Sequence, residues 1–212
     1  MLTPEQIEQN KNTFIDLINS IEREFDKEKL IKWLENSDFF TAPASTKYHS
    51  NFEGGLCYHC LNVYYSLEAL VKTFATEYTP GEDGEIETPR YSRDSIIIVG
   101  LLHDLSKANL YEKYNRNVKD EETGKWVQVE EYRCVDQHNP DRFVFGSHEE
   151  TAEFMVSQFL PLTVEESVAI LHHMGGSSHD SSQTDLSIIY GRYNLAALLH
   201  SADLLSTFVL EK

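Results

Sequence analysis

Residues Leu101–Lys107 read LLHDLSK, and the architecture that the sequence predicts is built around them. The run Ile96–Val99 precedes them, and the whole stretch predicts a helix over about residues 93–106 that is hydrophobic nearly all round and therefore buried. Inside it stand His103 and Asp104, whose polar side chains are costly to bury without a partner. That partner is either a hydrogen bond within the pair or a cation.

Other segments predicted to be helical also carry a histidine or an aspartate in apolar sequence. A single histidine on an apolar helix is more often a satisfied core residue than a metal ligand. Several such segments together favour one shared cation, because buried imidazoles and carboxylates then share a single partner. The residues concerned are His59, His148, the adjacent pair His172 and His173, and, on the last predicted helix, His200 and Asp203.

Nitrogen and oxygen donors of this kind indicate one or two divalent ions, with Mn, Fe, Ni, Co, Zn and Mg as the candidates. Two metals bridged by one carboxylate can bind both the attacking and the leaving oxygen of a phosphate ester. A metal-bound water loses a proton near neutral pH and becomes a nucleophile. The cluster is therefore typical of phosphoester hydrolysis.

The chain has 212 residues, with 18 Lys and Arg against 35 Asp and Glu, so its formal net charge is −17. A surface this acidic argues against a broad binder of long nucleic acids, whereas one local cationic site can still hold a small phosphorylated molecule. No apolar stretch approaches the roughly 20 residues of a membrane span, and the polar N-terminus does not resemble a signal peptide. Three cysteines make no disulfide framework, so we expect a cytoplasmic protein with reduced thiols.

The hydrophobic periodicity predicts a mainly α, single domain over residues 1–212. Thr3 followed by Pro4 predicts the start of the first helix, and Thr163 with Glu166 predicts a capping box. Residues 112–134 predict one small β-hairpin. Helices are expected over about 4–24, around 30–34, and over about 56–76, 93–106, 147–160, 163–174 (ended by Gly175 and Gly176) and 186–210, with loops at 38–55, 77–92 and 177–184.

Cys57 and Cys60 form a CxxC motif next to His59. A zinc ribbon needs a second pair of cysteines, and only Cys134 remains. On a helix both thiols lie on one side. Core packing is the stronger interpretation, and a redox or metal role is the alternative.

The ordered set of histidines and aspartates resembles the HD superfamily of metal-dependent phosphohydrolases. GGLCYHCLNV around His59 resembles the segment with the first ligand of that family, LLHDLSK resembles its HDxxK signature, and LLHSADLLST resembles the helix with its final aspartate. The additional histidines resemble the branch with two metals, which includes phosphodiesterases. The likeness implies an HD-domain helical bundle over 41–207, preceded by an N-terminal helical extension over 1–40.

Three further segments, TAPASTKYHSNFEGGL, GKWVQVEEY and LHHMGG, more closely resemble HD proteins of gut bacteria and their phages, whose substrate is not established. In those proteins a GHGE-type segment stands where this chain has Gly146-Ser147-His148-Glu149, so the histidine is displaced by one position and Glu149 is an alternative ligand. The resemblance implies a first metal on His59, His103, Asp104 and Asp203, and a second metal on Asp104, His148 and either His172 or His173, with His173 preferred.

Three further side chains are candidates for contacting phosphate. Lys107 follows Asp104 by three residues and is expected to neutralise a phosphate oxygen or orient the metal-bound water, which makes Asp104 and Lys107 the expected catalytic residues. A surface lysine at a helix end is the alternative. Lys47 and His49 precede the first ligand in a predicted loop and are expected to bind substrate, with a solvated loop as the alternative. His200 either bonds to the edge of the site or packs in the core.

The expected function is a divalent-metal-dependent phosphohydrolase or phosphodiesterase that cleaves a nucleotide-like phosphoester through metal-activated water. A cyclic dinucleotide or a short RNA end is a second substrate hypothesis, and the acidic surface weighs against the RNA. The alternative from another class is a non-catalytic nucleotide-binding or regulatory HD module. The expected partner is a small phosphorylated molecule, without a membrane, and the oligomeric state is left open.

Overall fold

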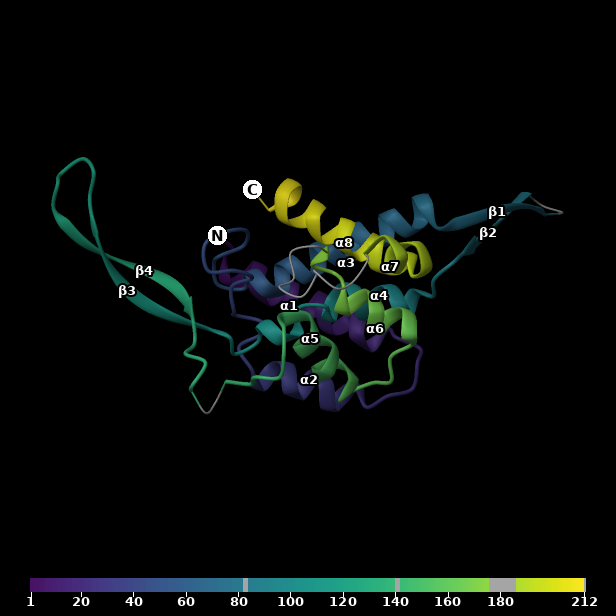
Figure 1. Cartoon of the computed structure of the whole chain (residues 1–212), viewed down its shortest axis with the longest axis horizontal. Coiled ribbons are helices and arrows are strands. Elements are labelled where there is room, and N and C mark those ends of the chain that lie inside the picture. Colours follow the sequence, from purple (N-terminus) through teal and green to yellow (C-terminus); the bar gives the residue numbers. More distant parts are fainter. Residues whose placement is uncertain (82–83, 140–141, 176–185, 212) are drawn as a thin grey trace.

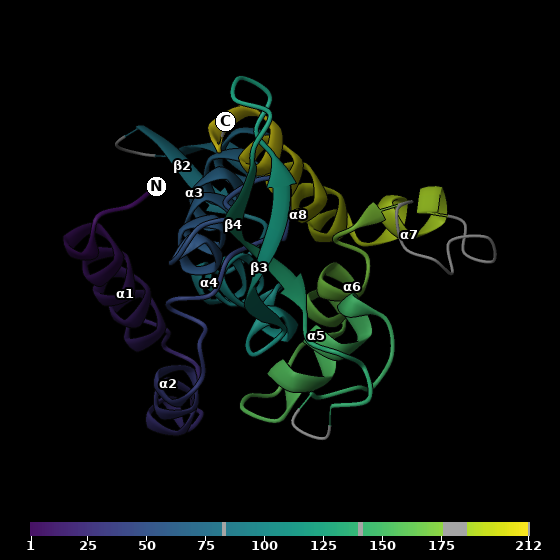
Figure 2. The ribbon, with the colours of Figure 1, turned by 90° about the vertical axis from the view of Figure 1, so that its left-hand side faces the viewer.

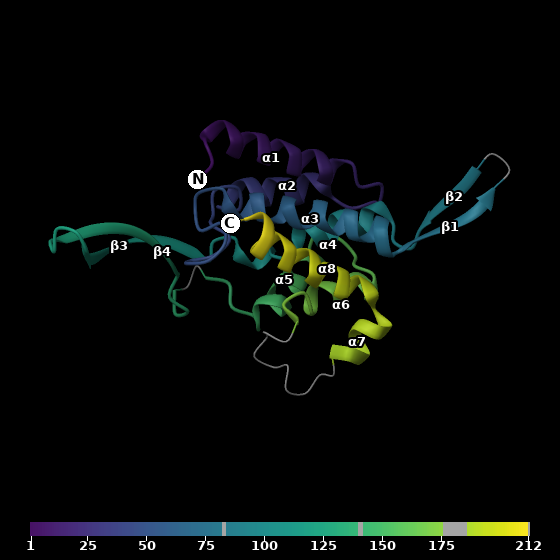
Figure 3. The ribbon, with the colours of Figure 1, turned by 90° about the horizontal axis from the view of Figure 1, so that it is seen from above.

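The computed structural model describes residues 1–81, 84–139, 142–175 and 186–211. Within these ranges the chain is mainly helical, as predicted, and it contains two antiparallel pairs of strands. The helices form one body, from which the two hairpins project at opposite ends (Figures 1 and 3). No helix in the described ranges is both long enough and apolar enough to cross a membrane.

The helices and strands follow one another in an order close to the predicted one. They are α1 (Pro4–Asn19), α2 (Lys27–Asn36), α3 (Gly55–Phe74), β1 (Thr76–Gly81), β2 (Gly84–Pro89), α4 (Arg93–Leu102), β3 (Tyr111–Lys119), β4 (Trp126–Cys134), α5 (His148–Ser157), α6 (Val164–Leu171), α7 (Leu186–Arg192) and α8 (Asn194–Leu205).

The first helix begins where predicted and ends earlier. The side chain of Thr3 accepts a hydrogen bond from the backbone of Gln6, and the side chain of Gln6 accepts one in return, which completes a capping box. α1 stops at Asn19 rather than near residue 24. The next free N–H groups, those of Glu22 and Arg23, donate instead to the carboxylate of Asp94 at 3.0 and 2.8 Å.

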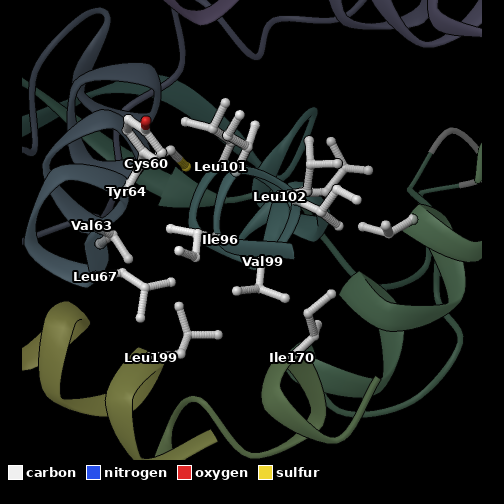
Figure 4. Packing of buried hydrophobic residues seen from close by; sticks show 14 of the residues in the cluster. Cys60, Val63, Tyr64, Leu67, Ile96, Val99, Leu101, Leu102, Ile170 and Leu199 are labelled. Atoms are coloured by element: carbon white, nitrogen blue, oxygen red, sulfur yellow. The ribbon is translucent and has the colours of Figure 1, made fainter. Parts of the chain in front are cut away.

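α4 is the central helix of the body, and α1, α3 and α6 pack against it (Figure 2). Every residue from Ile96 to Leu102 is buried, as the apolar run predicts. Figure 4 shows side chains of α4 meeting those of α3, α6 and α8, among them Leu67, Ile170 and Leu199. Gly100 allows α3 and α4 to approach closely, because a Cβ atom there would lie 2.8 Å from the Cα atom of Tyr64.

The central helix ends sooner than predicted, and the change falls on the histidine–aspartate pair. α4 stops at Leu102, His103 caps it, and Asp104 leaves the helical conformation with φ −105° and ψ 19°. A short 3₁₀ helix, Leu105–Lys107, follows. The pair therefore stands at the end of a buried helix rather than within one.

The last predicted helix is interrupted. Tyr193 has φ −122° and ψ 79°, which separates α7 from α8, and the chain then ends in a π-helical turn over Ser206–Leu210. The capping box of Thr163 with Glu166 is confirmed at the start of α6. Gly175 follows that helix with φ +60°, whereas Gly176 and the loop predicted over 177–184 lie outside the described residues.

The predicted hairpin over 112–134 is confirmed, with Tyr111 opposite Cys134 and Lys119 opposite Trp126. The prediction of a loop over 77–92 is wrong, because β1 and β2 form a second hairpin there. The acidic composition of this segment favoured a surface loop and did not indicate the two strands. Strand pairing depends on side chains across the ladder, such as Thr79 opposite Ile86, and these relationships are not visible in composition alone.

Candidate metal centre

The same local contact fixes two of the histidines at helix ends. His103 follows α4 and donates from Nδ1 to the carbonyl of Gly100 at 3.0 Å, and His173 follows α6 and donates from Nδ1 to the carbonyl of Ile170 at 2.7 Å. A carbonyl only accepts, so Nδ1 carries the hydrogen in both rings, and Nε2 of the neutral ring bears a lone pair. Both Nε2 atoms are buried without a hydrogen-bond partner.

His148 is the first residue of α5, where a capping box between Ser147 and Glu150 starts the helix. Its Nδ1 atom lies 2.7 Å from Oγ of Ser106, and its Nε2 atom lies 2.6 Å from Oδ1 of Asp104. The imidazole therefore points to the end of α4 from a different helix.

His59 on α3 and Asp203 on α8 complete the cluster, because these two helices pack side by side. Nε2 of His59 lies 3.3 Å from Oδ1 of Asp203 and 3.5 Å from Oδ2 of Asp104. Its other nitrogen, Nδ1, lies 3.0 Å from Oε1 of Glu211. His59 is thus held between a carboxylate behind it and two carboxylates in front.

Asp104 is the shared member of the cluster. Its Oδ2 atom faces Nε2 of His59 and of His103, each at 3.5 Å, whereas Oδ1 faces Nε2 of His148 at 2.6 Å and of His173 at 3.6 Å. The donor atoms of each set lie within 4.8 Å of one another. The two sets meet at the carboxylate of Asp104, which therefore joins two adjacent positions that could hold a metal.

The donors fit divalent metal ions in both chemistry and spacing. A metal that binds nitrogen and oxygen ligands at roughly 2.1 Å keeps neighbouring ligand atoms roughly 3.0–3.4 Å apart. Three of the four imidazole Nε2 separations from Asp104 are 3.5–3.6 Å, and that of His59 from Asp203 is 3.3 Å, which are longer than a good hydrogen bond and close to this spacing. The lone pairs on His103 and His173 face carboxylate oxygens, an arrangement that a cation between them stabilises.

The pKa values of the imidazoles differ across the cluster. Burial lowers the pKa of His103 to about 3, because an imidazolium is poorly solvated there. Burial also acts on His59, but the carboxylates of Asp203 and Glu211 outweigh it and raise the pKa to about 9. Protons and metal ions therefore compete for the nitrogen of His59, whereas His103 is available as a neutral ligand.

Lys107 gives the cluster one permanent positive charge. Its Nζ atom lies 2.7 Å from Oδ2 of Asp104. Burial alone would raise the pKa of Asp104, but the lysine and the neighbouring histidines hold it well below its usual range. The cluster meets solvent through the partly exposed side chains of Lys107, Asp203 and His148, which are 14%, 15% and 25% exposed.

The remaining sequence-predicted residues occupy different places. The ring of His49 lies 4.7 Å from that of His59, and both of its nitrogens are buried and unpartnered. Lys47 instead lines a cavity beside Arg116 and Tyr132 of the β3–β4 hairpin. His172 is half-buried and is not a member of the metal-ligand groups found among the described residues.

His200 takes the position at the edge of the site. Its Nδ1 atom donates to the carbonyl of His173 at 2.6 Å, which fixes the backbone of that residue. Cys57 and Cys60 are buried free thiols within the hydrophobic core, and burial raises the pKa of both.

Two residues of the site are absent from the sequence prediction. Ser106 lies inside the LLHDLSK segment, and its position two residues after Asp104 is a signal that could have been used. Glu211 lies in an unremarkable polar end of the chain, and no pattern in the sequence identifies it. Its importance depends on the turn that brings the end of the chain back to α3.

Comparisons with known proteins add no assignment. No protein-family model matches the chain, and neither do any of the curated proteins or solved structures with which it was compared.

Proposed function

We propose that this chain is a divalent-metal-dependent phosphohydrolase that cleaves a phosphoester of a small, nucleotide-like molecule. The observation that carries the proposal is the position of Asp104, each of whose carboxylate oxygens faces two imidazole Nε2 atoms. A bridging carboxylate between two sets of imidazole nitrogen donors suits a pair of metals acting on phosphate.

The two sets divide the ligands between the metal positions. His59, His103 and Asp203 would hold one ion, His148 and His173 would hold the other, and Asp104 would belong to both. Bound there, divalent ions polarise the phosphoryl group and lower the pKa of water to near neutral. This division of the ligands is the one that the resemblance to the HD superfamily implies.

Lys107 would contact the phosphoryl group. Burial alone would lower its pKa, but Asp104 outweighs that effect and raises the value above the usual range, so the ammonium stays charged at neutral pH. Its side chain is also one of those through which the cluster meets solvent. A fixed positive charge at that place stabilises negative charge that develops on phosphate oxygens.

The substrate would be small, because the net charge of −17 disfavours a long polyphosphate. His49 stands beside the first metal position with two unpartnered nitrogens, so it would contact substrate there. Lys47, which lines a cavity along the hairpin, would contact a more distant part of the molecule. The three free cysteines suit a reducing compartment, and we propose a cytoplasmic enzyme.

Metal analysis of the purified protein, followed by a hydrolysis screen with Mn²⁺, tests the proposal. The screen includes nucleoside phosphates, cyclic nucleotides, cyclic dinucleotides and short RNA. We expect about two metal ions per chain and release of a hydrolysis product from one class. Tight nucleotide binding without turnover would favour the non-catalytic module instead. A chain that neither binds divalent metal nor hydrolyses any member would overturn the proposal.

A further inference from the structure

The carboxylate of Glu211 is fully buried and receives hydrogen bonds from three side chains. Nδ1 of His59 lies 3.0 Å from Oε1, Nδ2 of Asn62 lies 3.1 Å from Oε1, and Oγ of Ser50 lies 2.6 Å from Oε2. These donors come from α3 and from the loop before it. Glu211 therefore ties the end of the chain to both.

The route of the chain explains how this residue reaches α3. α8 runs beside α3 (Figure 2), and the π-helical turn over Ser206–Leu210 also contacts α3. Glu211 follows that turn directly. The position of Glu211 beside His59 therefore depends on the C-terminal turn, because the two residues are far apart in the sequence.

His59 differs from the other imidazoles of the centre in its Nδ1 partner. The described partners of His103 and His173 are backbone carbonyls, and that of His148 is a serine hydroxyl, all of which are neutral. A carboxylate at Nδ1 holds the hydrogen there, leaves the Nε2 lone pair directed at the metal position, and increases the basicity of that nitrogen.

We propose that Glu211 is a positioning residue that orients His59 and strengthens its bond to the first metal. The inference rests on the proposed metal centre and adds to it a determinant of affinity at one of the two positions. The competing explanation is that Glu211 only anchors the end of the chain, for which its bonds to Ser50 and Asn62 would suffice.

Three variants separate these explanations. Glu211→Gln keeps the size of the side chain and an acceptor oxygen, but it removes the negative charge that lies beside Nδ1 of His59. Ser50→Ala removes an anchoring bond and leaves the carboxylate on His59. Glu165→Gln is a matched control, because Glu165 accepts a hydrogen bond from Tyr91 at 3.0 Å, away from the cluster.

The first measurement is the affinity for Mn²⁺ in the absence of substrate, which is monitored through the electron paramagnetic resonance signal of free Mn²⁺. The second measurement is thermal unfolding in the presence of a chelator. We expect Glu211→Gln to weaken one of two Mn²⁺ sites by about 10- to 100-fold, and Ser50→Ala and Glu165→Gln to leave both sites near the wild-type affinity. Unchanged affinity in Glu211→Gln, or an equal loss in Ser50→Ala, would overturn the inference while the metal centre stands. Wild-type protein that binds no Mn²⁺, Zn²⁺ or Fe²⁺ would overturn both.

Discussion

Oγ of Ser106 lies 2.7 Å from Nδ1 of His148, a residue 42 positions further along the chain. A serine hydroxyl can either donate to this nitrogen or accept from it. When Nε2 of His148 donates its hydrogen to Asp104, Nδ1 is an acceptor, and when Nε2 presents a lone pair to a metal, Nδ1 is a donor. Ser106 therefore holds the ring of His148 in the same orientation, whichever ring nitrogen carries the hydrogen.

The variant Ser106→Ala removes this support without removing a ligand. We expect metal affinity at the position of His148 to fall by about tenfold, because partners of a metal-bound histidine typically contribute this much. Mn²⁺ titration of the purified variant measures the change. Ser157→Ala is the matched control, since that hydroxyl donates to the carbonyl of Phe154 and accepts from the side chain of Gln158, both at the other end of α5 from His148. Equal affinities in wild type and Ser106→Ala would show that the ring is held by other contacts.

The adjacent histidines after α6 provide a second test. Nε2 of His173 is buried 3.6 Å from Asp104, whereas His172 is half-buried and uses its carbonyl to accept from the hydroxyl of Tyr190. We expect His173→Ala to lose about one metal ion per chain and His172→Ala to keep the wild-type content. Metal analysis by mass spectrometry compares the two. The reverse result would exchange the roles of the two residues.

The sequence predicted the helical class and the convergence of helix-borne residues because both follow from local pattern. The apolar run before His103 predicts a buried central helix, and that helix is the centre of the body. The position of the pair at the helix end was not predictable, because α4 ends through the backbone conformation of Asp104. Nothing in the residue types requires that conformation.

Long-range contacts account for the other differences. α1 ends early because Asp94, about seventy residues later, takes the next backbone N–H groups. Glu211 was missed for the same reason, since its contact with His59 spans 152 positions. The preference between His172 and His173 could not come from residue type alone, because both are histidines and only the end of α6 distinguishes them.

Asp104 is the residue whose replacement affects both metal positions. Asp104→Asn keeps the size of the side chain and removes the negative charge that faces four imidazoles and Lys107. We expect metal content to fall from about two ions per chain to near zero and turnover to be lost, because the bridging ligand is gone. Circular dichroism is expected to keep the helical signal, since Asp104 lies outside the helices. Full activity in this variant would contradict the assignment.

The ion pair between Arg23 and Glu166 joins the segment after α1 to α6, and it predicts a pH dependence of stability. Arg23 donates to both carboxylate oxygens at 2.8 and 2.7 Å, and the Glu166 side chain is fully buried. Burial acts to raise the pKa of Glu166, but the guanidinium outweighs it and lowers the value below the ordinary 4.5. Because the folded-state pKa is the lower one, the stabilisation is complete above about pH 4.5 and is lost as the pH falls further.

Glu166→Gln keeps the acceptor oxygen for Thr163 and removes the charge. We expect the free energy of unfolding to fall by about 2 kcal/mol at neutral pH, as for other buried charged hydrogen bonds, and the difference from wild type to shrink under acid conditions. Denaturant unfolding at about pH 7 and about pH 3 measures both. Glu131→Gln is the control, because its partner Arg116 is 55% exposed and such pairs contribute less than about 1 kcal/mol. If Glu166→Gln lowered the free energy of unfolding at neutral pH by no more than Glu131→Gln does, the buried pair would not stabilise the fold.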